Sequence, residues 1–194
     1  PGAAANIDED DINANKELIQ GSRVFMTQLE QSLDAAGTAL SFAKEGGAIT
    51  ILNPAPAQPL EENILKLCDF VTPNEIEAEQ ITGIPVKSIN DAEIAAEKLL
   101  DKGANAAVIT LGKQGALFKD NKQVIHQKSY EVGPVVETTG AGDAFNGGLA
   151  VALAEEMPID KALRFACATA SISVTRKGTA PSMPKRHEID TLLK

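Results

Sequence analysis

The stretch from Ala92 to Leu111, AEIAAEKLLDKGANAAVITL, holds the two patterns that decide the fold class. Its first half repeats apolar residues at the spacing of one helix face: Ala92, Ala95, Ala96 and Leu99. Its second half, residues 106–111, is a short continuous apolar run. The first pattern predicts an amphipathic helix and the second predicts a buried strand. A helix that leads into a buried strand is typical of α/β proteins with a parallel sheet.

The same alternation continues along the chain. Further short strands are expected at residues 24–26, 48–52 and 69–71. Helical spacing recurs in three more apolar sets, which are Leu60, Ile64 and Leu67; Phe145, Leu149 and Leu153; and Leu163, Cys167, Ala170 and Val174. Residues 116–118 and 124–126 flank Asp120-Asn121 and predict a β-hairpin. We therefore predict one unit, residues 1–194, with a doubly wound, mainly parallel sheet flanked by helices and an appended hairpin.

The composition narrows the possible functions. The chain has 194 residues, 43% of them apolar and 23% charged, which is enough to bury a sizeable core. Its net charge is −9, and the chain lacks the concentrated basic residues that are typical of a nucleic-acid-binding protein. No apolar run approaches the ~18 residues of a membrane-spanning helix. Two distant cysteines, Cys68 and Cys167, are typical of a reduced compartment, so a cytoplasmic protein is expected.

Polar residues follow the predicted strands at the point where each strand ends. These segments are Thr27-Gln28-Leu29-Glu30, Asn53-Pro54, Thr72-Pro73-Asn74-Glu75, Thr110-Leu111-Gly112 and, after the apolar pair Val135-Val136, Glu137-Thr138-Thr139. In open parallel sheets the ligand crevice lies outside the carboxyl ends of the strands. We therefore expect these five segments to converge on one edge, which forms the site.

The segment Thr138-Thr139-Gly140-Ala141-Gly142-Asp143 directly precedes a long helical pattern. Its glycines allow a tight turn, and the first amide groups of the helix would face that turn. This arrangement suits a phosphoryl group, and Asp143 in the first helical turn could accept a proton. An ordinary glycine turn with an acidic first turn is the alternative.

Two other nucleotide-binding motifs are excluded. A dinucleotide-binding loop would need a third glycine where the chain has Phe145, and it would lie in an opening βαβ unit. A Walker loop is excluded because the chain has no Gly-Lys-Ser or Gly-Lys-Thr.

Several separated motifs resemble those of the ribokinase-like carbohydrate kinase family. They are Glu137-Thr138-Thr139-Gly140-Ala141-Gly142-Asp143-Ala144-Phe145, the Asn-x-x-Glu motif in Thr72-Pro73-Asn74-Glu75-Ile76-Glu77, and residues 1–6, 53–57 and 175–182. The resemblance implies a ribokinase-like fold and ATP-dependent phosphorylation of D-ribose to ribose 5-phosphate. Two alternatives remain, which are another sugar or nucleoside as acceptor, and a truncated, non-catalytic nucleotide-binding module.

The resemblance also implies roles for individual residues. Asp143 corresponds to the catalytic base and contacts both sugar and ATP, while Gly140, Ala141 and Gly142 correspond to the anion hole, with Gly142 also at the nucleotide. Asn74 and Glu77 correspond to the pair that organises Mg²⁺ and phosphates, Glu77 through water. The predicted ATP site further includes Thr110, Leu111, Gly112, Lys113, Gln114, Gly115 and Cys167. Glu30 matches a carboxylate that binds sugar hydroxyls, and no role is assigned to His126 or His187.

A potassium site is implied as well. Its positions are Glu137, Thr139, Ser173, Arg176, Gly178 and Ser182, some of them through backbone oxygens, which are ligands that hard cations prefer. The family commonly has Asp where this chain has Glu137, so the carboxylate oxygens are displaced by one methylene. The implied cofactors are therefore ATP, Mg²⁺ and K⁺.

The resemblance begins partway into the family's chain. The family has an N-terminal part with a β lid over the sugar and most of the dimer contacts, and residues 1–194 are expected to lack it. The full-length chain is expected to be a homodimer, with ribose and ATP as its small-molecule partners and neither nucleic acid nor membrane.

Overall fold

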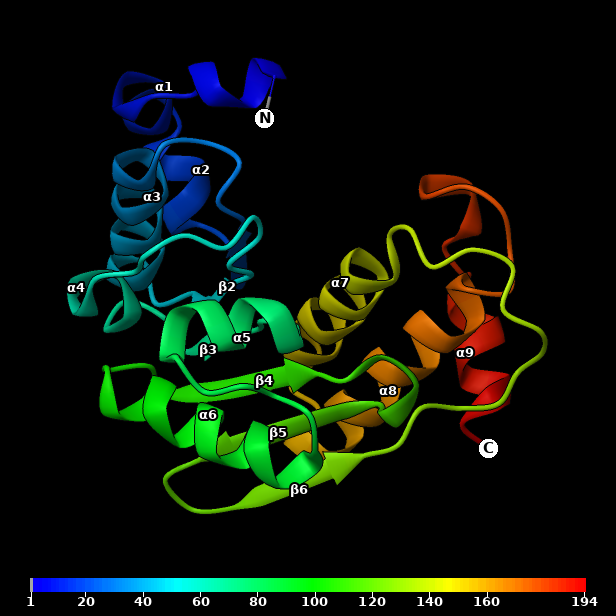
Figure 1. Ribbon diagram of the computed structural model, residues 1–194. Helices are drawn as coiled ribbons and strands as arrows, with labels where there is room; N and C mark the ends of the chain where they lie inside the picture. Colours follow the sequence, from blue (N-terminus) through cyan, green and yellow to red (C-terminus); the bar gives the residue numbers. More distant parts are fainter. Residues whose placement is uncertain (1) are drawn as a thin grey trace. The chain divides into compact units, whose positions relative to one another are not determined.

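Six strands form one sheet in the order β1-β2-β3-β4-β5-β6 in the computed structural model, which describes residues 2–194 (Figure 1). Pro1, the first residue of the N-terminal motif, lies outside the described residues. The strands are β1 (Val24–Thr27), β2 (Ile49–Leu52), β3 (Phe70–Val71), β4 (Ala106–Thr110), β5 (Ala116–Asp120) and β6 (Val124–Gln127). The pairs β1–β2, β2–β3 and β3–β4 are parallel. The predicted α/β class with a mainly parallel sheet is confirmed.

The chain groups into two compact units, and each is described by itself. The first comprises residues 1–109 and 118–124, and the second residues 110–117 and 125–194. The first unit contains the short 3₁₀ segment η1 (Gly2–Asn6) and the helices α1 (Glu9–Ala14), α2 (Lys16–Gln20), α3 (Leu33–Glu45), α4 (Glu62–Leu65), α5 (Glu75–Thr82) and α6 (Ile89–Asp101). The second contains η2 (Gly112–Gln114), α7 (Ala141–Ala154), α8 (Ile159–Ser173), η3 (Ala180–Ser182) and α9 (Arg186–Leu192).

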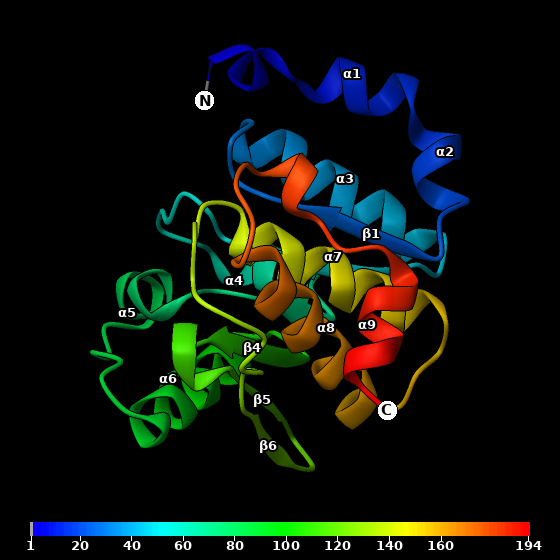
Figure 2. The same ribbon diagram turned by 90° about the vertical axis from the view of Figure 1, so that its right-hand side faces the viewer.

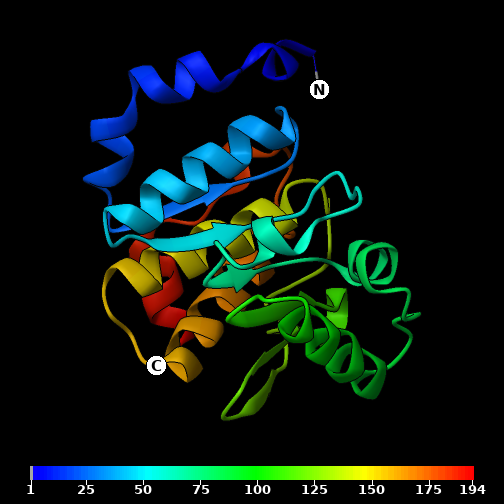
Figure 3. The ribbon, with the colours of Figure 1, turned by 90° about the vertical axis from the view of Figure 1, so that its left-hand side faces the viewer.

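In the first unit, α3 and α6 each bury an apolar face and begin at a serine that caps the helix. The side chains of Ser32 and Ser88 cap α3 and α6 by accepting hydrogen bonds from backbone amides of the first helical turn. Figure 3 shows α3 lying along β1 and β2, with which it is in contact. The predicted stripe of α6 is confirmed, because Ala92, Ala95, Ala96 and Leu99 are all fully buried.

In the second unit, α7 and α8 pack closely, and α9 contacts α8 (Figure 2). Gly148 of α7 makes this packing possible, since a Cβ there would lie 2.7 Å from Thr169 Oγ1 and 3.0 Å from Ala166 Cα. Arg186 of α9 donates to both carboxylate oxygens of Glu155, at 2.6 and 3.0 Å, and its guanidinium lies over the Phe165 ring.

One expectation is corrected by the structure. Leu60, Ile64 and Leu67 do not share one helix, because α4 spans only Glu62–Leu65. Three prolines at positions 54, 56 and 59 precede it and disfavour helix on the side of Leu60, while α4 ends at its C-cap Lys66, before Leu67. Val135 and Val136 form no strand and remain about half exposed, with the Val136 amide donating to the Val174 carbonyl at 2.8 Å.

The predicted hairpin is confirmed as β5–β6. Asp120 closes its turn, accepting hydrogen bonds on one carboxylate oxygen from the amides of Lys122 and Gln123, both at 2.8 Å. None of the helices in the described part of the chain has the length and apolar character needed to cross a membrane.

Candidate active site

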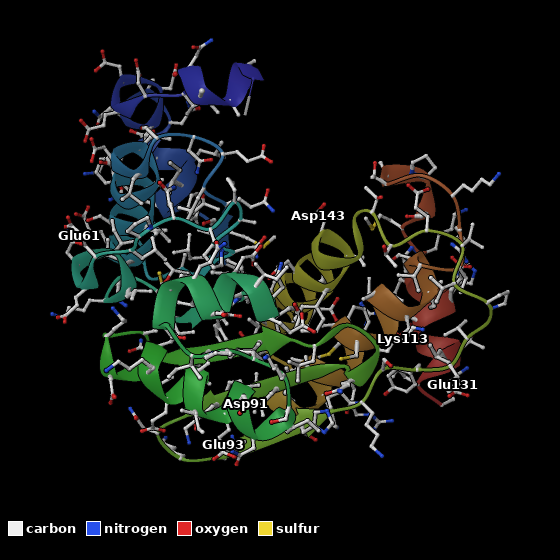
Figure 4. The ribbon with its side chains drawn as sticks, viewed as in Figure 1. Glu61, Asp91, Glu93, Lys113, Glu131 and Asp143 are labelled. Carbon is white, nitrogen blue, oxygen red and sulfur yellow. The ribbon has the colours of Figure 1, made fainter. Side chains whose placement is uncertain are left out.

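The helix α7 begins in the way that the glycine segment predicts. Gly140 has a φ of +81°, in the left-handed region where glycine carries no Cβ penalty, and it forms the N-terminal cap of the 14-residue helix. Its carbonyl accepts the first intrahelical hydrogen bond, from the Ala144 amide at 2.9 Å. Asp143 lies in the first helical turn with an exposed side chain (Figure 4).

The space beside this helix start is open at Gly142. A Cβ built on Gly142 meets no heavy atom within 4 Å, so packing does not explain the glycine. First-turn amides of an α-helix have no partner inside the helix and are suited to bind anions. The Ala141 amide is already used here, because it donates to the Thr138 carbonyl at 3.1 Å. The predicted anion hole is thus open at Gly142, while Ala141 holds the turn closed.

The predicted nucleotide loop follows β4. Residues Gly112–Gln114 form the 3₁₀ turn η2, and all three residues are exposed. The loop is closed by the Leu111 amide, which donates to the Gly115 carbonyl at 2.8 Å. Lys113 makes no ion pair within residues 2–194, and Figure 4 shows its position in the loop.

Two side chains that the sequence analysis left without a role bind this loop. His126 Nε2 lies 2.7 Å from the Gln114 carbonyl oxygen, and Ser129 Oγ donates to the Lys113 carbonyl at 2.6 Å. These contacts join residues 12 and 16 positions apart, and no spacing in the sequence indicates them. Cys167, predicted beside the nucleotide, is buried in α8, and burial raises the pKa of its thiol to about 12. The thiol is therefore protonated at neutral pH and almost fully enclosed by the protein.

The predicted potassium positions all lie in the second unit, but their side chains are engaged differently. Glu137 and Gly178 are brought together, since the Gly178 amide donates to Glu137 Oε2 at 2.8 Å. The hydroxyls of Ser173 and Ser182 donate to the carbonyls of Ala170 and Thr179, at 2.8 and 2.6 Å. Thr139 is exposed.

The Arg176 guanidinium pairs with Glu188 of α9, and this pairing is the main reason that the pKa of Glu188 falls to about 2. Because a guanidinium has no acceptor atom, Arg176 could serve a cation only through its backbone oxygen.

The Asn-x-x-Glu motif lies in the first unit and forms a reciprocal cap at the start of α5. The Glu77 amide donates to Asn74 Oδ1, while the Asn74 amide and side-chain Nδ2 donate to the two Glu77 carboxylate oxygens, all three at 2.9 Å. Burial is the largest influence on Glu77 and raises its pKa, whereas the Asn74 hydrogen bonds oppose this shift. The carboxylate is thus fixed in direction and half-buried.

Of the five polar segments predicted to converge, the three that follow β1, β2 and β3 are linked by hydrogen bonds within the first unit. Gln28 Nε2 donates to Asn53 Oδ1 at 2.9 Å, and Asn53 Nδ2 donates to the Thr72 carbonyl at 2.8 Å. Asn53 is buried and links all three strand ends. Glu30, the predicted sugar-binding carboxylate, follows β1 and is exposed.

The carboxylates of the described residues suit Mg²⁺ only if the ion keeps most of its water ligands. Within residues 2–194 no three or more His, Cys, Asp and Glu side chains gather in a way that could hold a metal ion. Mg²⁺ commonly keeps several waters and binds through one or two carboxylates plus substrate phosphates. A single oriented carboxylate, that of Glu77, fits this mode of binding.

The pfkB family carbohydrate kinase model matches residues 1–186 of the chain. The chain is 41% identical to a ribokinase of Haemophilus influenzae over 96% of its own length, and 36% identical to a deoxyribokinase of Salmonella typhi over 99%. The structure of Arabidopsis thaliana ribokinase complexed with ribose and ATP matches with a TM-score of 0.90 and 30% identity, covering 97% of this chain and 60% of that one. The chain spans 61% and 63% of the two curated relatives. It belongs to the pfkB family of carbohydrate kinases.

Proposed function

We propose that the protein transfers the γ-phosphoryl group of ATP to the 5-hydroxyl of D-ribose and forms ribose 5-phosphate. One observation carries the proposal: an exposed carboxylate, Asp143, lies in the first turn of a 14-residue helix beside the open position of Gly142. A base and an anion-binding helix start so close together suit phosphoryl transfer, which depends on positioning and electrostatic stabilisation. The ribokinase relatives support this substrate pair.

Asp143 would act as the general base. It would accept the proton of the sugar hydroxyl as the oxygen attacks phosphorus, while the bond from phosphorus to the departing ADP oxygen breaks. The amide of Gly142 and the positive end of α7 would stabilise the charge on the transferred group. A positioned base contributes about 10²–10⁴-fold to the rate.

The remaining predicted residues would hold the two substrates and the cations. The loop of residues 110–115 would hold the nucleotide with Cys167 of α8 beside it, and Glu30 would bind sugar hydroxyls. Asn74 and Glu77 would hold Mg²⁺ through water, and that ion would neutralise phosphate charge. Glu137, together with backbone oxygens of residues 176–182, would bind K⁺.

The deoxyribokinase relative favours a second candidate substrate, 2-deoxyribose. The two sugars differ by one hydroxyl group, and a site built to hydrogen-bond that hydroxyl would reject the sugar lacking it. We propose ribose because the residues of five separate motifs resemble those of ribokinases. We also propose a cytoplasmic location, which the free thiols of Cys68 and Cys167 support.

ADP release measured with ATP, Mg²⁺ and either sugar tests the proposal. We expect release that depends on ribose, exceeds the rate with 2-deoxyribose, and is accompanied by a ribose 5-phosphate signal in the ³¹P NMR spectrum. A faster rate with 2-deoxyribose would favour the second candidate. ATP binding without sugar-dependent ADP release would instead indicate a non-catalytic nucleotide-binding module.

A further inference from the structure

The nucleotide loop has little structure of its own. The turn η2 is three residues long, and its residues Gly112, Lys113 and Gln114 are exposed. Besides the bond from the Leu111 amide to the Gly115 carbonyl that closes the loop, its internal hydrogen bonds run from the Gln114 amide to the Leu111 carbonyl at 2.9 Å and from the Gly115 amide to the Gly112 carbonyl at 3.1 Å. An exposed turn with so few contacts opens easily unless other parts of the chain hold it.

Residues 126–129, at the end of β6 and just after it, hold the loop in place by hydrogen bonds. The carbonyl oxygen of Gln114 can only accept a hydrogen bond, so His126 Nε2, 2.7 Å away, must carry the proton and donate it. Ser129 Oγ donates to the next carbonyl along, that of Lys113, at 2.6 Å. Two consecutive backbone carbonyls of the loop are thus fixed by side chains from outside it.

The backbone of the loop at Gly115 also lies close to the backbone of residues 127–129. Gly115 has a φ of +92°, and a Cβ there would lie 1.9 Å from the Gln127 carbonyl oxygen and 2.7 Å from the Ser129 amide nitrogen. The segment is in turn attached to α8, because the Tyr130 amide donates to Ser171 Oγ at 3.0 Å. The loop is therefore connected through residues 126–130 to a buried helix.

We propose that His126 and Ser129 are positioning residues, which hold the backbone of the loop at residues 113 and 114 in the conformation that binds nucleotide. This inference rests on the proposed function, in which residues 110–115 contact ATP. Neither side chain needs to touch the nucleotide. A loop that adopts the binding conformation for only a fraction of the time binds with a Kd raised by the inverse of that fraction.

The experiment compares paired variants of each residue in the whole protein. His126→Ala and Ser129→Ala remove the donor, whereas His126→Gln and Ser129→Thr keep one. His187→Ala and Ser22→Ala are the controls, because His187 is the other histidine of the chain and Ser22 donates a similar bond, 2.7 Å long, to the Ile19 carbonyl. Two quantities are measured, the Kd for ATP by titration calorimetry and the amide hydrogen exchange of residues 111–115.

We expect each alanine variant at positions 126 and 129 to raise the Kd for ATP by up to about 5-fold, the full effect of one lost hydrogen bond. Exchange at residues 111–115 should accelerate by a similar factor, while exchange in α8 stays unchanged. The donor-keeping variants should restore most of the affinity, and the two controls should bind like wild type.

Three results would overturn the inference. One is wild-type affinity in both alanine variants, the second is equal weakening in the alanine and donor-keeping variants, and the third is accelerated exchange throughout the second unit. Failure of the wild-type protein to bind ATP at all would instead refute the proposed function, on which the inference depends. The faster loop exchange in the alanine variants would still be measurable in that case.

Discussion

The substitution Gly142→Ala, which adds one methyl group, should change the stability of α7 and the proposed phosphoryl transfer in opposite directions. Gly142 lies in the first turn of α7, and its backbone does not have the positive φ that would require glycine. A Cβ there meets no heavy atom within 4 Å. The substitution Gly142→Ala therefore creates no steric conflict within the protein.

The magnitude of each effect follows from this geometry. Alanine in a helix is more favourable than glycine by about 0.5–1 kcal/mol, which corresponds to a rise in Tm of about 1–4 °C for a chain of this size. The new methyl group would occupy the space where the phosphoryl group approaches the helix start. Displacing reacting groups by about 1 Å can cost 10²-fold in rate, so we expect kcat/KM to fall by about that factor.

Gly147→Ala is the matched control for this prediction. Gly147 lies further along α7, and a Cβ there also meets nothing within 4 Å. The same gain in Tm is expected at unchanged activity. Circular dichroism melting curves and steady-state rates of ADP release measure the two quantities. If Gly142→Ala retained wild-type kcat/KM, the transferred group would not approach this part of the helix and the proposed anion hole would be refuted.

Three further predictions concern other parts of the site. Gly115→Ala should lower the free energy of unfolding by about 2–5 kcal/mol, measured by urea unfolding, because it combines a strained positive φ with a clash against the Gln127 carbonyl; wild-type stability would contradict the packing described here. The raised pKa of Glu77 means that the folded state binds this proton more tightly than the unfolded chain, so its contribution to stability is present at low pH and is lost as the pH rises through the folded-state pKa. In Glu77→Gln this pH-dependent loss of stability should disappear from urea unfolding curves recorded between about pH 4 and 7. An unchanged pH profile would refute the raised pKa of Glu77 as its cause. Glu137→Ala removes both the proposed potassium ligand and the acceptor of the Gly178 amide, and the ratio of rates in KCl and NaCl, expected above one in wild type, should fall to about one; equal wild-type rates in the two salts would contradict the proposed potassium site.

The elements with clear periodicity could be predicted from the sequence. The stripe from Ala92 to Leu99 and the run that forms β4 carry their own pattern, so the helix and the strand lie where expected. The segment around Leu60 shows where such patterns fail, because the prolines before α4 override the helical spacing. Val135 and Val136 are apolar but form no ladder, and two apolar residues without a partner strand do not make a strand.

The local structure of the candidate site could be predicted only where a local motif carries it. The glycine start of α7 and the reciprocal cap of Asn74 and Glu77 span a few consecutive residues, so the motif is sufficient. The bonds of His126 and Ser129 to the loop depend on how the chain folds back after β6. A lone histidine and a lone serine give no local signal of such contacts.

The Asp143→Asn variant tests directly whether Asp143 is the base of a sugar kinase. The substitution keeps the shape of the side chain and removes its ability to accept the hydroxyl proton. We expect ribose-dependent ADP release to fall by about 10²–10⁴-fold while the Kd for ATP stays at the wild-type value. Near-normal turnover in Asp143→Asn, in a preparation whose wild-type protein is active, would contradict the account.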